Sequence, residues 1–219
     1  MKNKAEQIIQ SISEQLKTLS EVIQKDSLKK TSRKRRVENR ITIVDERDGN
    51  QYRFVKIGNL YWCTENLRYL PEVSQDESED EPRYYVYGYE GDDVDEAKNT
   101  NKYSQYGALY NWPAAMEACP PGTRLPTDEE WKELVSHYGG DTVAGNILKT
   151  EEFNTLMGGY RRTDNSFGFF GWNAYFWSSS ESSSTAAWVR CLHSSETGVY
   201  RAAINKGHGL SVRCVINIK

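Results

Sequence analysis

Residues 175–215, YFWSSSESSSTAAWVRCLHSSETGVYRAAINKGHGLSVRCV, decide how the rest of this chain is interpreted. In a strand, alternate side chains point to opposite faces of the sheet. One predicted face carries Trp188, Arg190, Leu192, Val199, Arg201 and Ala203, and the other carries Val189, Cys191, His193, Tyr200, Ala202 and Ile204. We expect the first set to point inward as a framework. The second set mixes a thiol, an imidazole, a phenol and methyl groups, unlike a core-facing row or a plain solvent face. This mixture is typical of a recognition surface, and an ordinary exposed sheet face is the alternative.

The composition fits one domain of ordinary size with an appendage, because the chain has 219 residues. Its hydrophobic content is 37% and its mean hydropathy is −0.76. The 14 Tyr and 6 Trp residues can nevertheless build a core, since their rings bury large areas. The net charge of −3 argues neither for nor against a polyanionic partner. The charge is unevenly spread: residues 1–40 hold 11 basic and 5 acidic residues, and residues 71–100 hold 2 and 11.

The sequence contains no apolar run of about 18 residues, so we expect no membrane-spanning segment. The beginning, MKNKAEQIIQSISEQL, lacks the continuous apolar region of a secretion signal. We therefore expect a protein that stays in the cytoplasm or leaves the cell by another route, for example by lysis. The cysteines are Cys63, Cys119, Cys191 and Cys214. No C-x-x-C pair occurs among them, which argues against zinc, and without export we expect reduced thiols.

Residues 1–28 predict an oligomerisation helix. Apolar residues recur at spacings of 4, 3, 4, 3 and 4, at Ala5, Ile9, Ile12, Leu16, Leu19 and Ile23. This narrow heptad stripe favours a coiled coil, and an amphipathic helix packed on its own domain is the alternative. We expect a homo-oligomer, a trimer or tetramer, although the mixed Ile/Leu seam does not itself fix the number of strands. Residues 29–40, KKTSRKRRVENR, predict a solvated basic linker. Contact of this linker with nucleic acid is the weaker alternative, because it lacks aromatic residues for base stacking.

Residues 41–219 predict the globular domain. Strands are expected at residues 41–44, 52–57 and 60–62, with turns at residues 48–50 and 58–59. Residues 71–100 predict an acidic, solvated insertion with little core material apart from YYVY at residues 84–87. The spacing of its aspartates does not match a calcium-binding EF-hand loop.

Two helices are predicted next. Residues 107–118, GALYNWPAAMEA, predict a helix despite Pro113, which is expected to end or kink its first turn. Thr127 and Glu130 have the spacing of a capping box, which predicts a helix with a buried stripe, ended by two glycines. The stripe residues are Trp131, Leu134 and Val135, and the glycines are Gly139 and Gly140. Residues 141–175 predict mostly loop with aromatic–glycine stretches.

The order of several motifs resembles a known family. The motifs are KIGNLYWCTENLR (56–68), YGALYNWPAAMEACPPGTRLPTDEEW (106–131), GGYR (158–161), YFWSSSE (175–181), AWVR (187–190) and GLSVRCV (209–215). Together they resemble the Fibrobacter succinogenes major paralogous domain, over about residues 41–215. The resemblance implies an α+β, C-type-lectin-like domain with two helices and a small twisted antiparallel sheet. It also implies that Cys119 and Cys214 lie close together, as a structural pair or as buried thiols, with no disulfide required.

The chain is also similar to variable proteins of diversity-generating retroelements, which use the same lectin-like fold. Mutation of adenines in AAC codons there yields residues such as Ser, Thr, Ala, Val, Cys, His, Gly, Tyr and Ile. That set occurs here within the region of about 178–210, at residues 182–186, 189, 191, 193–195, 197, 200, 202–204 and 207–208. The resemblance assigns Trp188, Arg190, Leu192, Val199, Arg201 and residues 209–215 to the invariable framework.

Catalytic interpretations are weak. Formylglycine-generating enzymes need a particular late cysteine pair, and Cys191 and Cys214, the late cysteines here, do not fit that role. No G-x-S-x-G nucleophile motif occurs. His137, His193 and His208 lack metal-ligand spacing, and His137 is expected on a helix surface. The Glu-Pro-Asn and Trp-Asn-Asp motifs of calcium-dependent lectins do not occur. We expect no enzyme activity, no metal and no cofactor.

The sequence thus predicts a ligand-binding protein with a diversified C-terminal surface, encoded by a phage or another mobile element, that binds a protein or cell-surface ligand. The expected ligand-binding residues are Ser182, Ser183, Ser184, Thr185, Val189, Cys191, His193, Ser194, Ser195, Thr197, Tyr200, Ala202, Ala203, Ile204, Gly207 and His208. Tyr200 is the expected anchor, because a rigid amphipathic ring gives contact area at low entropic cost. The alternatives are an undiversified structural or adhesive module of the same fold and an intracellular adaptor whose linker meets nucleic acid.

Overall fold

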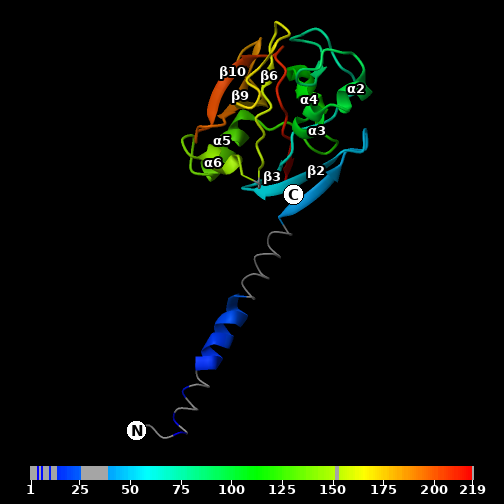
Figure 1. Cartoon of the computed structure of the whole chain (residues 1–219). Helices are drawn as coiled ribbons and strands as arrows, with labels where there is room; N and C mark the ends of the chain where they lie inside the picture. Colours follow the sequence, from blue (N-terminus) through cyan, green and yellow to red (C-terminus); the bar gives the residue numbers. More distant parts are fainter. Residues whose placement is uncertain are drawn as a thin grey trace. The chain divides into compact units, whose positions relative to one another are not determined.

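The computed structural model describes Lys4, Glu6, Gln10 and residues 14–25, 39–150 and 153–218. The chain divides into two units, residues 1–40 and residues 41–219. Figure 1 shows the helical N-terminal segment in blue and the larger unit with its helices and sheets. None of the helices in the described residues is long and apolar enough to cross a bilayer.

Residues 14–25 are helical, as predicted. The predicted seam residues Leu16, Leu19 and Ile23 are exposed by 56–61%, so this part of the apolar stripe is open to solvent. The other seam positions, Ala5, Ile9 and Ile12, and most of the predicted basic linker lie outside the described residues.

The second unit begins with a meander of strands. Its elements are β1 (Arg40–Val44), β2 (Gln51–Ile57) and β3 (Leu60–Cys63), and β11 (Val215–Asn217) from the chain end joins them in the order β1-β2-β3-β11. The predicted strands and turns of this region are confirmed. Gly49 and Gly58 have φ values of 76° and 60°, which glycine adopts without the steric cost of a side chain, so both turns fit their sequences.

The helices of this unit are α2 (Val94–Lys98), α3 (Asn101–Tyr106), α4 (Trp112–Ala118), α5 (Asp128–His137) and α6 (Ala144–Leu148). The predicted helix over residues 107–118 is too long. Its first part forms β5 (Leu109–Tyr110), and Asn111 caps α4 by accepting a hydrogen bond from the backbone N–H of Ala114. Pro113 lies in the first turn of α4, where a missing N–H costs nothing.

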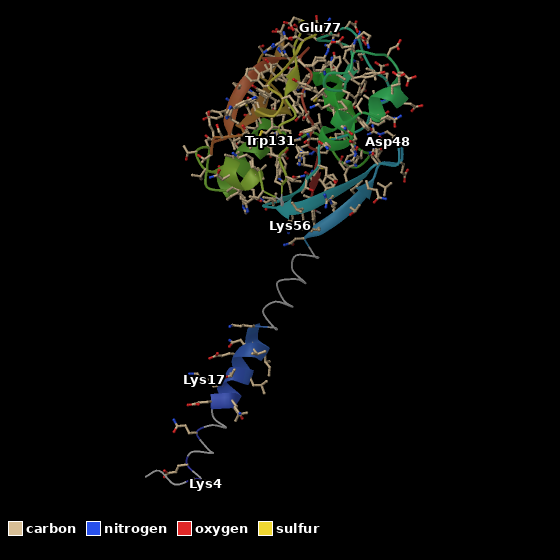
Figure 2. The ribbon with its side chains drawn as sticks, in the orientation of Figure 1. Lys4, Lys17, Asp48, Lys56, Glu77 and Trp131 are labelled. Carbon is tan, nitrogen blue, oxygen red and sulfur yellow. A yellow bond between two sulfur atoms is a disulfide. The ribbon has the colours of Figure 1, made fainter. Side chains whose placement is uncertain are left out.

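Helix α5 matches its prediction closely. Thr127 and Glu130 form the reciprocal capping box, and Trp131, Leu134 and Val135 are buried. The indole N–H of Trp131 donates to the carbonyl oxygen of Trp177, 3.2 Å away. Figure 2 shows Trp131 within the domain and Glu77 at its surface.

The acidic segment 71–100 is more ordered than predicted. It contains β4 (Tyr84–Tyr85), which pairs with β5, and α2. Val86 and Ala97 are fully buried, so the segment contributes core material and is not only a solvated loop. The aromatic side chains supply the burial that its charges cannot.

The second main sheet has the order β10-β9-β8, with β8 (Asn173–Glu181), β9 (Ala186–His193) and β10 (Tyr200–Asn205). The strands β6 (Tyr160–Arg161) and β7 (Phe167–Gly168) form a separate two-stranded sheet, and Gly159, just before β6, bridges to Ala174 of β8. Both faces of the β10-β9-β8 sheet are covered. One face contributes Trp177 and Val189 to a cluster that includes the alanines of α4, here called the α4-side cluster. The other contributes Phe176 and Leu192 to a cluster with Trp131 of α5, here called the α5-side cluster. The architecture is α+β, as predicted.

A disulfide joins Cys119, at the end of α4, to Cys214, just before β11. Their Cα atoms are 5.9 Å apart, and the bond closes a loop with a sequence separation of 95 residues. The expected proximity and burial of this pair are confirmed, but the expectation of reduced thiols is wrong for it. Cys63 and Cys191 are buried free thiols.

Candidate ligand-binding surface

The predicted binding residues follow the β9–β10 hairpin and the loops at its two ends. The strands pair antiparallel, with Tyr200 opposite Cys191 and Ala202 opposite Val189. Because paired residues share a face, Tyr200 and Ala202 lie on the same side of the sheet as Val189 and Cys191. Among the described residues, β10 pairs with β9 alone and forms an edge of its sheet.

The predicted outward face of β9 is buried, so this part of the face assignment is wrong. Val189 is fully buried and Cys191 is 9% exposed, because β9 is the middle strand and the α4-side cluster covers this face. Asn173 donates a hydrogen bond to the Cys191 sulfur at 3.3 Å. Burial raises the pKa of the Cys191 thiol, which keeps it protonated and a poor nucleophile.

The other face of β9 carries the framework residues. Arg190 and Leu192 point inward, as predicted. The Arg190 guanidinium donates to the carboxylate and the backbone carbonyl of Asp128, at 2.6 and 3.0 Å. Trp188 is only half-buried, and the guanidinium carbon of Arg201 lies 3.2 Å from its ring centroid. Trp188 is therefore a covered surface residue and not the core residue that we expected.

At one end of the hairpin, the β9–β10 loop exposes most of its side chains, and its backbone is held in place by contacts with neighbouring segments. Lys149, just after α6, donates to the carbonyl oxygens of His193, Ser194 and Glu196 at 3.2, 3.3 and 2.5 Å. The Thr197 hydroxyl donates to the carbonyl oxygen of Thr142 at 2.6 Å.

The loop also packs closely against α6. A Cβ atom at Gly145 would lie 2.4 Å from the carbonyl oxygen of Gly198, a contact that only glycine avoids. The N–H of Val199 donates to the carbonyl oxygen of Asp141 at 2.8 Å. These contacts fix the course of the loop from both sides.

A wide groove of about 740 Å³ runs along this loop. Its lining includes Asp141 and Thr142 from the α5–α6 connection and Ser195, Thr197 and Tyr200 from the hairpin. Tyr200 is 52% exposed, and its hydroxyl donates to the carboxylate of Glu196. Hydroxyl, carboxylate and phenol groups therefore border one groove, in which polar groups can orient a ligand.

The opposite end of the hairpin is bordered by acidic side chains. Asn205 donates to the carboxylate of Glu79 at 2.6 Å, and Lys206 donates to Glu181 at 2.5 Å. A Cβ atom at Gly207 would lie 2.5 Å from a carboxylate oxygen of Glu77, so the acidic segment 71–100 packs against this turn. No local sequence pattern predicts this contact, because the two segments are about 130 residues apart in the chain.

His208 at this end is half-buried. Its ring stacks on Tyr160 with a centroid distance of 5.8 Å. Burial lowers the pKa of His208, which favours the neutral imidazole near pH 7.

The predicted site residues thus differ widely in exposure. Exposed are Ser183, Ser184, Thr185, Ser194, Ser195, Thr197, Tyr200 and Ala203. Half-buried are Ser182, His193, Ala202, Ile204 and His208, and buried are Val189, Cys191 and Gly207. Most of the exposed ones lie in the loops at the two ends of the hairpin, and Tyr200 and Ala203 lie on the edge strand β10.

The sequence interpretation missed several residues of this surface. The groove is bordered by Asp141, Thr142 and Glu196, and Lys149 binds the carbonyl oxygen of Glu196 in the loop beside it. Trp172 is 60% exposed, its ring centroid is 6.1 Å from that of His193, and its carbonyl oxygen accepts a hydrogen bond from Ser194. A tryptophan directly after the aromatic–glycine stretch 167–171 is visible in the sequence. The contacts of Lys149 with the loop carbonyls, in contrast, depend on tertiary structure.

The described residues contain no group of three or more His, Cys, Asp or Glu side chains arranged to hold a metal ion. The polar groups of the surface are engaged mostly with backbone carbonyls and with one another. This arrangement is suited to contact with a ligand through exposed side chains on a fixed backbone.

Comparison with known proteins gives one family and no individual relatives. The model of the Fibrobacter succinogenes major domain matches residues 55–216, which include α2 to α6 and both main sheets except β1 and part of β2 and β11. Neither a curated protein nor a solved structure matches the chain. The match covers well over half of the sequence, and on this ground the chain belongs to the Fibrobacter succinogenes major domain family.

Proposed function

We propose that this chain is a receptor-recognition protein of C-type-lectin-like fold, whose β9–β10 hairpin binds a protein or cell-surface ligand. In this proposal the chain is the variable protein of a diversity-generating retroelement, carried by a phage or another mobile element. The binding surface consists of the β9–β10 loop with its groove and the exposed side of β10, with the Asn205–His208 turn at its other end.

The observation that carries the proposal is the combination of exposed side chains with a braced backbone at the β9–β10 loop. Ser194, Ser195 and Thr197 are exposed, while the carbonyls of the loop are bound by Lys149. A loop held in this way accepts different side chains at Ser194 and Ser195 at little cost in stability, because the contacts of Lys149 with the backbone do not depend on them. A fixed backbone also lowers the entropy lost on binding.

The same geometry limits which positions can vary. Val189, Cys191 and Gly207 are buried, and their substitution would disturb the core or displace Glu77. This observation favours the second candidate function, an undiversified structural or adhesive module of the same fold. The neighbouring DNA discriminates between the two: a reverse transcriptase gene and a near-copy of the 3′ end that differs at adenines support the first.

Assembly is part of the proposal. The exposed Leu16, Leu19 and Ile23 support self-association of residues 1–28 as a coiled coil, a trimer or tetramer. Several linked copies would raise the avidity for a repetitive surface far above the affinity of one domain. The nucleic-acid adaptor stays the weakest alternative, since it rests on the basic linker alone.

The experiment is a binding scan with stability measured on the same variants. The full chain is incubated with whole bacterial cells and with a displayed peptide library, and the bound partners are selected. Ser194→Arg, Ser195→Arg and Tyr200→Ala should each weaken the selected interaction and leave the free energy of unfolding within about 0.5 kcal/mol of the wild-type value. Ser104→Arg, on the exposed side of α3, is the matched control and should bind normally. Normal binding by all three hairpin variants would place the recognition surface elsewhere.

A further inference from the structure

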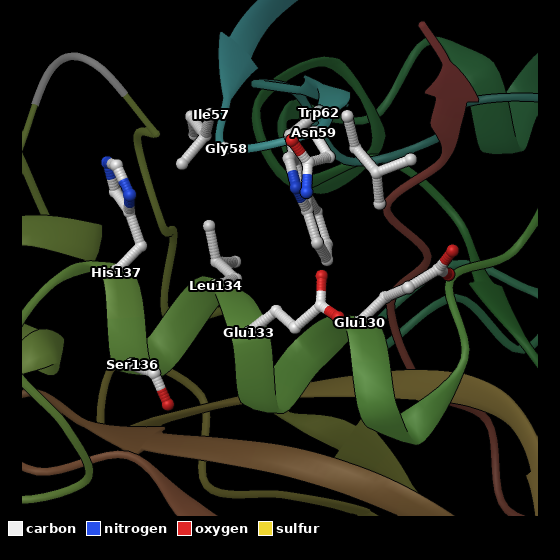
Figure 3. Close-up of a pocket in the computed structure, with 10 residues that line it drawn as sticks. Ile57, Gly58, Asn59, Trp62, Glu130, Glu133, Leu134, Ser136 and His137 are labelled. Carbon is white, nitrogen blue, oxygen red and sulfur yellow. The ribbon is translucent and has the colours of Figure 1, made fainter.

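A second cavity, of about 430 Å³, opens between the β2–β3 hairpin and α5 (Figure 3). Ile57, Asn59 and Leu60 border it from the hairpin, and Glu133, Leu134 and His137 border it from the helix. None of these residues belongs to the candidate ligand-binding surface. The volume is in the range of small-molecule sites, about 300–1,000 Å³.

The floor of the cavity is apolar. Ile57, Leu60 and Leu134 belong to the α5-side cluster and are 2–8% exposed, so only the outer atoms of these side chains reach the cavity. Contact with these atoms removes apolar surface from water, which favours a ligand with a hydrocarbon part.

The acidic groups at the rim differ in their partners. Both carboxylate oxygens of Glu130 accept hydrogen bonds from Arg124, at 2.7 and 2.5 Å, so its charge is compensated. Glu133 forms no hydrogen bond or ion pair with any residue that the structure describes. Figure 3 shows its carboxylate turned from the helix towards the hairpin, whereas the hydroxyl of Ser136 points away.

The imidazole of His137 lies four residues further along α5 than Glu133, and thus on the same side of the helix. Its ring contacts Tyr138, and within the described ranges its nitrogens have no hydrogen-bond partner. Both side chains are near the C-terminal end of α5, where the helix dipole favours positive charge. The sequence alone suggested only a histidine on a helix surface.

We propose that this cavity binds a free alkylamine, with the ammonium group at the Glu133 carboxylate and the alkyl chain over Ile57, Leu60 and Leu134. A compact ammonium has three donors that point in different directions, which suits the carboxylate of Glu133 and the amide oxygen of Asn59. A hydrogen bond to the ionised Glu133 is stronger than one between neutral groups, so Glu133 supplies most of the specificity.

The test is an NMR titration of the ¹⁵N-labelled full chain with n-pentylammonium, with 1-pentanol as the uncharged probe of similar size. The amine should cause saturable shifts of the backbone amides of Gly58, Asn59 and Leu134. Glu133→Gln should lower its affinity by about tenfold or more, since a hydrogen bond to a charged group is lost. The matched control is Glu129→Gln, because Glu129 is exposed on the same helix and paired with Lys132 at 2.8 Å, and its affinity should stay within about twofold.

Three outcomes would overturn the proposal: equal binding of pentanol and pentylammonium, an equal loss of affinity in both glutamate variants, or saturable shifts only at other sites. The spectrum of each variant without ligand serves as the folding control. Glu133 is exposed and makes no contact that supports the fold, so a dispersed spectrum is expected for its variant.

Discussion

The Arg190 guanidinium on β9 lies 2.6 Å from the Asp128 carboxylate in the first turn of α5, and both side chains are buried. Arg201 from the edge strand β10 binds the same carboxylate at 3.0 Å. One acid therefore fixes α5 to two neighbouring strands of the hairpin that carries the candidate ligand-binding surface.

Asp128→Asn is expected to lower the free energy of unfolding by about 3–5 kcal/mol, because it leaves the buried Arg190 without a carboxylate. Urea unfolding at pH 7 measures the change. Glu129→Gln, at the exposed neighbouring position, should change stability by less than about 0.5 kcal/mol. A loss as small as that for Asp128→Asn would show that the ion pair does not hold the sheet to α5.

The same carboxylate predicts a pH dependence. Burial alone would raise the pKa of Asp128, but the hydrogen bonds from Arg201 and Arg190 outweigh it and lower the pKa to about 2. The folded-state pKa is below the unfolded value, so the stabilisation is present at neutral pH and is lost as the pH falls from about 4 to 2. The contribution is about 2 kcal/mol. Unfolding curves between pH 6 and pH 2 should fall less steeply for Asp128→Asn than for the wild type, and parallel curves would contradict the assignment.

The disulfide gives a third prediction. Reduction of the Cys119–Cys214 bond, or the double substitution by alanine, should lower the free energy of unfolding by about 3–5 kcal/mol, because the bond closes a long loop in the unfolded chain. Thermal melts with and without reductant measure this loss. Mass spectrometry after alkylation without reductant should find two blocked cysteines, at Cys63 and Cys191, once the protein is unfolded. Four blocked cysteines would show that the pair is not bonded.

Trp131 and Trp188 should differ in their contribution to the free energy of unfolding. Trp131 is fully buried and stacks on Phe176, so Trp131→Ala is expected to cost about 3–5 kcal/mol. Trp188 is half-buried beneath Arg201, and Trp188→Ala should cost only about 1–2 kcal/mol, through lost surface contact and the lost cation–π interaction. Chemical unfolding of the two variants side by side decides the order. An equal loss of unfolding free energy in the two variants would indicate that Trp188 is a core residue, as its strand pattern suggests.

Self-association is tested by truncation. Removal of residues 1–28 should leave a folded, monomeric domain, because the exposed seam residues Leu16, Leu19 and Ile23 lie in the removed segment. Light scattering at micromolar concentration should give several times the chain mass for the full-length protein and a single mass for the truncated one. A monomeric full-length protein would rule out the coiled coil.

How far the sequence predicted this fold depended on how local the signals were. The capping box of Thr127 and Glu130 acts within one helical turn, and α5 was predicted with its buried residues. The prediction of which face of β9 is exposed is wrong, because an alternating pattern is interpreted as one covered and one exposed face. In the structure, β9 is a middle strand with a hydrophobic cluster on each side. Burial of Val189 is decided by α4 and its neighbours, which no local pattern contains.

In the candidate surface, too, features set by local sequence are predicted and features set by tertiary contacts are not. Exposure of Ser195, Thr197 and Tyr200 agrees with the sequence prediction, since polar loop residues at a hairpin end are normally exposed. The bracing of that loop by Lys149 comes from a segment more than 40 residues earlier in the chain. The disulfide does not follow from the sequence for another reason. The expectation of reduced thiols rests on the lack of a secretion signal, which says nothing about how the cysteines are placed in the fold.

The contacts of Lys149 and Gly145 with the β9–β10 loop separate two kinds of evolutionary change. Substitution of an exposed side chain leaves the three carbonyls within reach of Lys149, but an inserted or deleted residue moves at least one of them away. The close approach of Gly145 to Gly198 leaves no room for a longer path on the inner side. This loop can therefore change its exposed chemistry by point replacement at constant length, and under the proposed function its specificities would change in that way, unlike those of antibody loops, which also vary in length.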